Sequence, residues 1–238
     1  MKKLILAFLL LCPVWAAAEL GAPLQQPDID VFDKQSLRRG LKTYVDRCLG
    51  CHSLKHLRYR RLQQDLALSD AEMKALFPHL ERIIGTMTTA MDDKDAKAWF
   101  GVATPDLSER VRALGSDWLY TYLRTFYKDD KRPFGVNNWV FKDVAMPHVL
   151  WDLQGEQAPV IVETGGNPVI QKLELVKPGE LSPQEFNRLV ADLVNFMAYA
   201  AEPAQLERVK IGKYVILFLL LLAFVSWRLK KAYWQDVH

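Results

Sequence analysis

The sequence predicts a mainly α-helical head, with loop and hairpin insertions, joined to one C-terminal transmembrane helix. Two segments, residues 36–48 and 182–201, repeat apolar side chains at spacings of three and four, which is the period of a helix that buries one face. A third segment, residues 211–227, is apolar and, at about 17 residues, reaches the lower limit for a membrane-spanning helix. The chain of 238 residues therefore divides into a head large enough for one domain and a C-terminal anchor.

The N-terminus has the three parts of a secretory signal. Two lysines precede an apolar run over residues 4–11, and three alanines that end at Ala18 follow as a cleavage site. The apolar run is too short to span a bilayer. Cys12 lies inside this segment as one of its hydrophobic residues, and the proline after it disfavours a lipoprotein signal. We expect residues 1–18 to be removed and the head to fold outside the cytoplasm.

The first predicted helix leads directly into a pentapeptide, Cys-Leu-Gly-Cys-His, at residues 48–52. Two cysteines separated by two residues and followed at once by histidine form the attachment signature of c-type haem. Each thiol adds across one haem vinyl group, so the sulfurs of Cys48 and Cys51 have to lie one helical turn apart on the same side. His52 then falls beneath the ring, where its imidazole can bind the iron as the proximal ligand. The sequence therefore predicts a cytochrome c-like haem domain with one haem c held by two thioether bonds.

Two other interpretations of this motif are weaker. A structural zinc site needs a second close pair of ligands, and the sequence has no second Cys-x-x-Cys pair. A dithiol redox motif does not require the histidine that follows Cys51. Once the signal is removed, Cys48 and Cys51 are the remaining cysteines. Because haem would occupy both, we expect no disulfide in the mature protein.

Two helices are predicted between the motif and the middle of the head. Ser69 and Glu72 form a capping box for a helix that ends near Phe77. Residues 117–127 place their apolar side chains on one helical face. The insertion at residues 62–99 contains no motif that assigns it a role.

The next stretch is predicted to be irregular and then β-rich. Residues 128–138 are charged and contain proline, which is typical of an exposed loop. Residues 160–162 and 169–176 are rich in β-branched side chains. A Gly-Gly-Asn-Pro turn lies between them, so the sequence favours a small hairpin here.

The last helix of the head has a clear beginning. Ser182 and Glu185 form a second capping box, with proline at the first helical position, and the helix should run to about residue 201 before Pro203. In haem c domains the first and last helices cross and pack together. The residues that we expect at this crossing are Gly40, Tyr44, Phe196 and Tyr199.

The sixth ligand of the iron decides whether the haem transfers electrons or binds small molecules. Met146 is the preferred candidate because the proline after it prevents a helix, and a loop-borne Met followed by Pro is a common setting for this ligand. His148 is its main competitor, and Met87 and Met91 also lie in a polar stretch. A His/Met pair would give a relatively high potential. Two other methionines lie on predicted helices and are expected in the core: Met73 and Met197.

Charge along the chain predicts its orientation. Arg228, Lys230 and Lys231 follow the anchor, and the positive-inside rule places such residues in the cytoplasm. We therefore expect an anchor at residues 210–228 and a cytoplasmic tail at residues 229–238. The whole chain has a net charge of +3.

The head by itself is mildly acidic. Residues 19–209 contain 24 Lys and Arg against 27 Asp and Glu. This balance could help to steer a basic redox partner, although an ordinary solvated surface accounts for the same count. Nucleic acid is not among the partners that we expect.

Several longer motifs, spread over nearly the whole mature chain, resemble cytochrome c1, the haem c subunit of the cytochrome bc1 complex. The anchor is preceded by a segment typical of that family, and the Met-Pro motif falls where the family has its distal Met. The motifs are Cys51-His52-Ser53-Leu54-Lys55 with Leu57-Arg58-Tyr59, Pro105-Asp106-Leu107-Ser108 with Val111-Arg112-Ala113, Met146-Pro147-His148-Val149-Leu150-Trp151, and Ala200-Ala201-Glu202-Pro203.

The resemblance implies a role for each candidate site residue. Cys48 and Cys51 would hold the haem, with His52 as proximal ligand and Met146 as distal ligand.

Arg112 matches a position near a haem propionate in the family, where a guanidinium could donate two hydrogen bonds. Pro105 would shape the edge of the haem site. Some family members also have a disulfide in the head. The mature chain cannot form one, so we expect the loop at residues 137–143 to be held by packing alone.

The function that the resemblance implies is electron transfer within quinol:cytochrome c oxidoreductase. The subunit would take electrons from the Rieske iron–sulfur protein and pass them to a soluble or membrane-held cytochrome c, without bond chemistry of its own. It would lie beside cytochrome b in a dimeric complex of the bacterial inner membrane, with the head in the periplasm. A membrane-anchored mono-haem carrier or oxidase subunit outside such a complex is the alternative, and a haem enzyme or gas sensor would need an open distal site.

Overall fold

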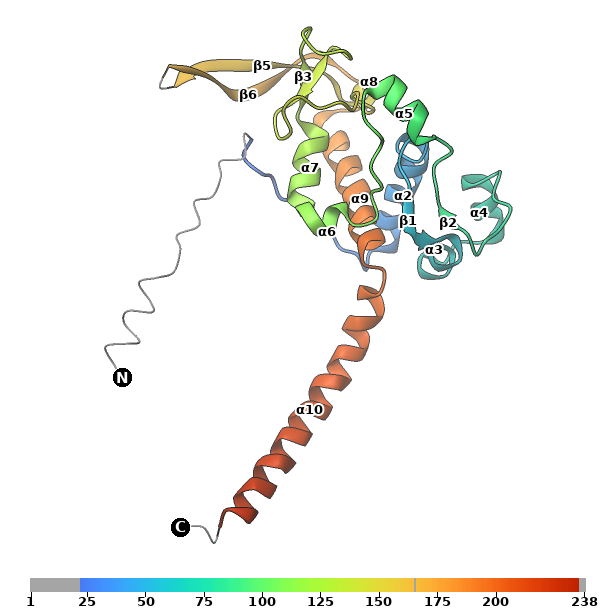
Figure 1. The fold of residues 1–238 in the computed structure, drawn as a ribbon, viewed down its shortest axis with the longest axis vertical. Coiled ribbons are helices and arrows are strands. Elements are labelled where there is room, and N and C mark those ends of the chain that lie inside the picture. Colours follow the sequence, from blue (N-terminus) through green and yellow to red (C-terminus); the bar gives the residue numbers. More distant parts are fainter. Residues whose placement is uncertain (1–21, 165, 236–238) are drawn as a thin grey trace.

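A computed structural model describes residues 22–164 and 166–235, and the predicted signal at residues 1–18 lies outside this part of the chain. Figure 1 shows a helical head from which one long helix, α10, extends. The helices are α2 (Lys34–Arg47), α3 (Tyr59–Leu66), α4 (Asp70–Leu76), α5 (Asp93–Phe100), α6 (Arg110–Leu114), α7 (Ser116–Arg124), α8 (Trp151–Gln154), α9 (Pro183–Ala201) and α10 (Gln205–Tyr233).

Six short strands pair into three antiparallel two-stranded sheets within the described residues. The expectation of a mainly helical protein with hairpin insertions and one apolar C-terminal helix is confirmed. The paired strands are β1 (Leu54–Arg58) with β2 (Thr86–Met87), β3 (Phe126–Lys128) with β4 (Val136–Asn138), and β5 (Gly155–Thr164) with β6 (Asn167–Pro178).

The centre of the head is the crossing of α2 and α9, as the sequence predicted. Gly40 lies against the main chain of Asp192, so close that a Cβ atom at Gly40 would lie 2.0 Å from its carbonyl oxygen. The rings of Tyr44 and Phe196 pack with their centroids 5.6 Å apart, and Tyr199 follows on the same helix. All three aromatic side chains are almost completely buried. The crossing fixes where α2 ends and hence where the haem motif begins.

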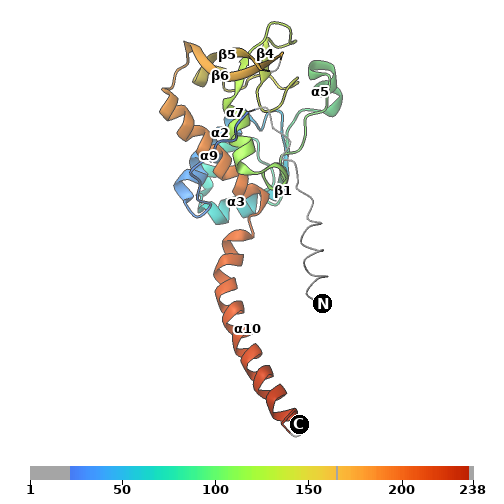
Figure 2. The same ribbon diagram turned by 90° about the vertical axis from the view of Figure 1, so that its left-hand side faces the viewer.

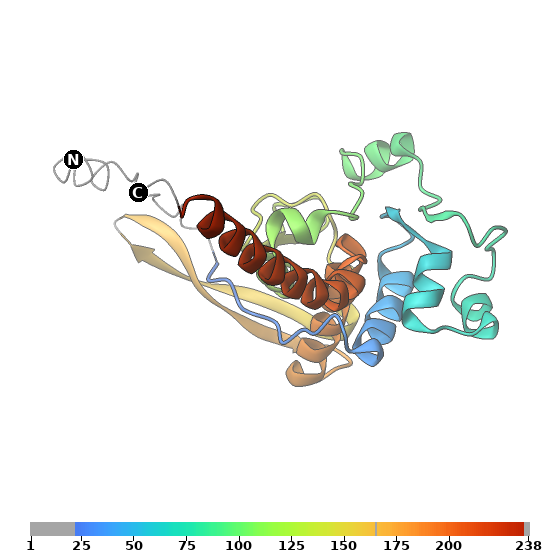
Figure 3. The same ribbon diagram turned by 90° about the horizontal axis from the view of Figure 1, so that it is seen from below.

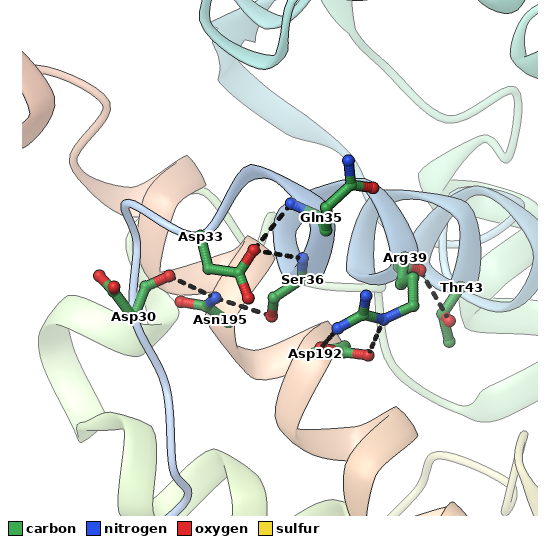
Figure 4. Close-up of polar contacts among 8 residues, drawn as sticks. All are labelled: Asp30, Asp33, Gln35, Ser36, Arg39, Thr43, Asp192 and Asn195. Atoms are coloured by element: carbon green, nitrogen blue, oxygen red, sulfur yellow. Dashed lines mark hydrogen bonds and ion pairs between the residues drawn. The ribbon is translucent and has the colours of Figure 1, made fainter.

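Polar contacts surround the crossing at its N-terminal end (Figure 4). Arg39 makes a bidentate ion pair with Asp192, at 2.6 and 2.9 Å. The amide of Asn195, on the buried side of α9, donates to the carbonyl oxygen of Asp30 and to the Ser36 hydroxyl, at 2.7 and 2.9 Å. These bonds satisfy polar groups that would otherwise be costly to bury between two helices.

The insertion at residues 62–99 forms a lobe of its own beside α2 (right in Figure 1). The predicted capping box begins α4, since Ser69 accepts from the Glu72 amide while the Glu72 carboxylate accepts from the Ser69 amide. The ring of Phe77, just after α4, meets the edge of Tyr59 at 4.9 Å. The side chains that fill this lobe are Leu62, Leu66, Leu68, Met73 and Phe77.

The helix predicted at residues 117–127 ends earlier, at Arg124, and a strand follows. The side-chain amide of Asn138 donates to the carbonyl oxygen of Tyr122 at 2.8 Å. The main-chain amide of Trp139 donates to the carbonyl oxygen of Thr125 at 3.0 Å. These bonds take the last carbonyl groups of α7, which no longer have partners in the helix. The predicted loop at residues 128–138 is therefore bounded by the β3–β4 pair, which the sequence analysis did not anticipate.

The loop at residues 137–143 is held by hydrogen bonds as well as packing, so the expectation of packing alone is wrong. The Asn138 side chain accepts from the amides of Val140 and Phe141, at 2.9 and 3.0 Å. The Asn137 side chain accepts from the Asp143 amide at 2.8 Å. Two asparagines thus hold a short loop that contains no disulfide.

The predicted hairpin is present and is longer than expected. Strands β5 and β6 pair from Gly155 opposite Pro178 to Thr164 opposite Asn167. Figures 1 and 3 show the hairpin projecting from the side of the head that lies away from the 62–99 lobe. Its base is fixed by the Gln157 amide, which donates to the carbonyl oxygens of Arg124 and Phe126, both at 2.9 Å.

Helix α10 leaves the head as a separate rod (Figure 2). At about 1.5 Å per residue, its 29 residues extend about 44 Å, more than the hydrocarbon core of a bilayer. It is a candidate membrane span with a mean hydropathy of 2.1 over its most apolar window, and none of that window is buried in the protein.

The base of α10 is tied to the head by a polar network. Arg61 donates to the carbonyl oxygen of Pro203 at 3.1 Å, and it pairs with Asp65 at 2.5 Å and with Glu207 at 3.2 Å. The Tyr199 hydroxyl completes the network by donating to Asp65 at 2.9 Å. The anchor is therefore fastened to both α3 and α9 rather than hanging from a loose linker.

Candidate haem site

The motif at residues 48–52 continues the last turn of α2. The amide of Cys48 donates to the carbonyl oxygen of Tyr44 at 2.8 Å. The amides of Cys51 and His52 both donate to the carbonyl oxygen of Cys48, at 3.0 and 2.8 Å. This turn places the two cysteines one helical turn apart, as attachment to two vinyl groups requires. The Tyr44 hydroxyl donates to the His52 carbonyl oxygen at 2.9 Å and so joins the turn to the buried crossing.

Both thiols are partly buried and free. Burial raises the pKa of Cys48 to about 12, and the nearby Cys51 raises it further while Arg47 opposes the shift. Burial likewise raises the pKa of Cys51. The two groups are therefore protonated thiols at neutral pH. Formation of each thioether adds the sulfur and one hydrogen across a vinyl double bond.

The imidazole of His52 is held by a backbone carbonyl group. Its Nδ1 lies 2.8 Å from the carbonyl oxygen of Pro105. A carbonyl oxygen can only accept, so Nδ1 carries the proton and Nε2 keeps the lone pair that could bind iron. Burial lowers the pKa of His52, which favours the neutral ring, although the bond to Pro105 opposes this shift. A metal-binding histidine is commonly oriented by such a partner on its other nitrogen.

The segment that carries Pro105 is fastened alongside the motif. The amide of Leu107 donates to the Ser53 carbonyl oxygen at 2.9 Å. The carboxylate of Asp106 accepts from the amides of Lys55 and Ser108, at 3.0 and 2.9 Å. The carbonyl oxygen of Pro105 orients His52. This contact is more specific than the role predicted for Pro105 at the haem edge.

A cavity of about 310 Å³ lies beside Cys51. Thr89 closes one side of it, since its hydroxyl donates to the Gly50 carbonyl oxygen at 2.7 Å and its amide donates to Ser53 at 2.9 Å. Its walls are polar, from the following residues: Cys51, Ser53, Lys55, Thr88, Thr89, Met91, Asp92, Asp93, Thr104 and Asp106.

The methionines of the described chain separate into core residues and two that lie in loops, Met91 and Met146. Met87 is completely buried where β2 pairs with β1, so it is a core residue rather than a loop ligand. Met73 and Met197 are also in the core, as expected. Met91 lines the cavity beside Cys51. Met146 lies in the loop after β4, is partly buried, and its Sδ atom lies 3.6 Å from the Tyr122 hydroxyl.

His148, the competitor of Met146, has a packing role in this structure. Its ring stacks on Phe126 with the centroids 4.7 Å apart and the planes nearly parallel. Burial lowers the pKa of His148 to about 4, so the ring is neutral at physiological pH.

Helix α6 carries two arginines, Arg110 and Arg112. Arg112 is exposed and lies 3.9 Å from Glu202 at the end of α9, so its one ion pair in the described part of the chain is loose. Arg110, which the sequence analysis did not select, makes no ion pair among the described residues. The positive charge of Arg110 lowers the pKa of both His52 and Tyr122, although burial is the largest influence on each.

These groups fit a covalent haem c. Two neutral thiols one helical turn apart would form the thioethers, and an oriented imidazole with a free Nε2 would bind the iron. When bound, the haem supplies an iron that changes reversibly between its ferric and ferrous states. The chain would supply the attachment through Cys48 and Cys51 and the orientation of the His52 ring.

Comparison with known proteins settles the family. The model of the Cytochrome C1 family matches residues 25–159 and 168–237, which is most of the chain. The chain belongs to the cytochrome c1 family. It is thus a membrane-anchored electron-transfer subunit that carries one covalent haem c.

Individual relatives agree with the family match. Cytochrome c1 of Allochromatium vinosum is 49% identical over 244 residues, which cover the whole of both chains. Cytochrome c1 of Rhodospirillum rubrum is 27% identical over 87% of this chain and 83% of its own. A Nitrosomonas europaea protein named ammonia monooxygenase gamma subunit is 43% identical over all of this chain and 98% of its own.

Proposed function

We propose that this cytochrome c1 family member takes one electron at a time from a Rieske iron–sulfur protein and passes it to a cytochrome c. The observation that carries the proposal is the pair of contacts that prepares the motif. His52 is oriented by the Pro105 carbonyl oxygen, and Cys48 and Cys51 lie on one turn that continues α2. The chain itself makes and breaks no substrate bond, because its work is to hold the haem and to keep both iron ligands in place.

The proposed ligand set assigns a role to each of six residues. Cys48 and Cys51 form the thioethers, and His52 and Met146 bind the iron on opposite sides. The backbone of Pro105 sets the plane of the His52 ring. Arg112 serves a haem propionate, for which its exposed guanidinium would leave its loose contact with Glu202.

Replacement of Met146 by Ala tests the ligand set. The expected result is loss of the far-red absorption that Met–iron bonding produces, with a fall in midpoint potential while haem c stays attached. Unchanged absorption and potential would contradict Met146 as ligand. A retained Met–iron band would assign the distal position to another methionine, such as Met91 beside Cys51. A wild-type protein without this band would favour His148 or an open site, and with an open site a haem enzyme or gas sensor.

The proposed topology follows from the two ends of the chain. A signal at residues 1–18 is cleaved, the head at residues 19–209 lies in the periplasm, residues 210–228 span the inner membrane, and residues 229–238 lie in the cytoplasm. Lys230 and Lys231 near the end of α10 support this orientation. Fusion of alkaline phosphatase after residue 209 should give an active enzyme, and fusion after residue 235 an inactive one. The reverse pattern would contradict the orientation.

The proposed assembly is a dimeric bc1 complex with cytochrome b and the Rieske protein. Cytochrome b would contribute two haem b for each haem c. Purification of the C-terminally tagged chain in mild detergent, followed by alkaline pyridine spectroscopy, should therefore give a ratio of about two. Haem c alone, obtained reproducibly, would instead support the alternative, a membrane-anchored mono-haem carrier or an oxidase subunit outside a bc1 complex.

A further inference from the structure

One buried phenol, that of Tyr122, contacts the sulfur of Met146. The hydroxyl of Tyr122 lies 3.6 Å from the Sδ atom of Met146, within the range for a hydrogen bond to sulfur. A thioether has no hydrogen to give, so the hydroxyl donates and the sulfur accepts. Within the described residues this is the one hydrogen bond of that hydroxyl. Tyr122 is itself buried, on the inner face of α7.

The ring of Tyr122 has little freedom to turn away. It stacks on Trp118 with centroids 5.0 Å apart and an interplanar angle of 8°, and it meets Phe126 edge to face at 5.2 Å. Trp118 and Tyr122, four residues apart, lie on one side of α7. Phe126 lies at the start of β3, which follows this helix. The hydroxyl is therefore aimed by two aromatic neighbours and does not depend on Met146 for its position.

The same aromatic row holds both ends of the Met-Pro-His sequence. Tyr122 contacts Met146, and Phe126 stacks on His148 at 4.7 Å. Pro147 between them restricts the backbone. Side chains of α7 and of the strand that follows it thus contact both ends of the Met-Pro-His sequence.

We infer that Tyr122 is a positioning residue that donates a hydrogen bond to the Met146 sulfur and thereby raises the midpoint potential of the haem. The inference rests on the proposed function, because it takes Met146 as the distal ligand. When one lone pair of the sulfur accepts a hydrogen bond, the sulfur donates less electron density to iron through its other lone pair. The ferric state needs that donation more than the ferrous state, so a weaker donor favours reduction.

Tyr122→Phe in the full-length, membrane-anchored protein tests the inference. Phenylalanine keeps the stacking on Trp118 and the contact with Phe126 but removes the hydroxyl. The expected result is a lower midpoint potential and a shifted far-red Met–iron band, with wild-type haem c content. Tyr120→Phe is the matched control, because Tyr120 is a buried tyrosine of the same helix whose hydroxyl makes no hydrogen bond in the described chain. It should leave the potential and the band unchanged.

The outcomes separate this inference from the proposed function. If Met146→Ala abolishes the far-red band but Tyr122→Phe leaves the band and potential at wild-type values, the ligand stands and the role of Tyr122 is refuted. A raised potential in Tyr122→Phe also refutes it, because the sign is then wrong. If Met146→Ala changes neither quantity, the proposed ligand set fails and the inference fails with it. An effect of Tyr120→Phe equal to that of Tyr122→Phe would reduce the role of Tyr122 to general packing.

Discussion

Gly40 and Asp192 are in direct main-chain contact where α2 crosses α9. A methyl group on Gly40 would lie 2.0 Å from the carbonyl oxygen of Asp192 and 2.7 Å from Cβ of Phe196. Neither atom belongs to the flexible end of a side chain. The distance between the first and last helices of the head therefore depends on the absence of one side chain.

Gly40→Ala should force the two helices apart and destabilise the head by about 1–3 kcal/mol, the usual cost of overpacking. Because α2 delivers the cysteines to their positions, the yield of protein with covalent haem should fall as well. Chemical unfolding and in-gel haem staining measure the two effects. Gly212→Ala in α10 is the matched control, since this glycine is also helical and a Cβ there meets nothing within 4 Å. Equal losses in both variants would contradict the role of close approach.

The ion pair between Arg39 and Asp192 should respond asymmetrically to removal of its partners. The side chain of Asp192 is only 10% exposed, whereas that of Arg39 is 55% exposed. Arg39→Gln leaves a nearly buried carboxylate without its partner, and we expect a loss of about 1–3 kcal/mol. Asp192→Asn leaves a guanidinium that water can solvate, so the loss should be smaller. Unfolding of both single variants and the double variant measures the coupling, and equal single losses would contradict this account.

Asn138→Ala should loosen the loop that leads to Met146. The substitution removes acceptors for the amides of Val140 and Phe141 and the donor to the Tyr122 carbonyl oxygen. Loss of bonds to buried groups costs about 1–3 kcal/mol, and we also expect the far-red Met–iron band to weaken on mild heating. Asn167→Ala, at the exposed tip of the β5–β6 hairpin, is the control. A band as heat-stable as that of the wild type would show that the loop does not depend on Asn138.

Asp106→Ala should disturb the proximal side of the site without touching a proposed ligand. Its carboxylate accepts from the amides of Lys55 and Ser108 and so keeps the Pro105 segment beside His52. We expect the free energy of unfolding to fall by about 1 kcal/mol. We also expect His52 to be released from the haem at a lower temperature, which the change of the Soret band on heating measures. Asp95→Ala on α5, an exposed acidic residue outside this segment, should have no effect. Identical melting curves for the two variants would refute the role of Asp106.

The start of α9 should lose a stabilising contact in acid. Hydrogen bonds from the hydroxyl and amide of Ser182 lower the pKa of Glu185. A carboxylate whose pKa is lower in the folded than in the unfolded protein stabilises the fold above its unfolded value, about 4.3, and loses this effect as the pH falls through the folded value. Glu185→Gln should therefore be less stable than the wild type at pH 7, with a difference that shrinks below pH of about 4. A difference independent of pH would contradict this account.

The sequence was informative wherever a local rule determines the structure. Capping boxes at Ser69 and Ser182 begin helices because they satisfy amide groups within four residues of themselves. The haem motif is equally local, since thioether spacing allows one arrangement. The crossing at Gly40 was also predictable, because a small residue on an apolar helical face marks a place where another backbone can approach.

The sequence was less informative where a distant partner decides the outcome. The end of α7 at Arg124 depends on Asn138, whose amide takes a carbonyl group of the helix. Met87 looked like a loop residue, but pairing of β2 with β1 buries it. The bond between His52 and Pro105 joins residues 53 positions apart. No periodicity in the chain records such contacts, and Arg110 gave no signal beyond its place next to the Pro-Asp-Leu-Ser segment.

The contacts between α10 and the head limit how far the head can move relative to its anchor. Arg61 donates a hydrogen bond to the carbonyl oxygen of Pro203 and makes an ion pair with Glu207. The first turn of the anchor is therefore expected to move with α3 and α9. A head mounted in this way keeps a constant height and tilt above the lipid. Under the proposed function, we therefore expect the partner proteins, rather than this head, to move between successive electron-exchange positions.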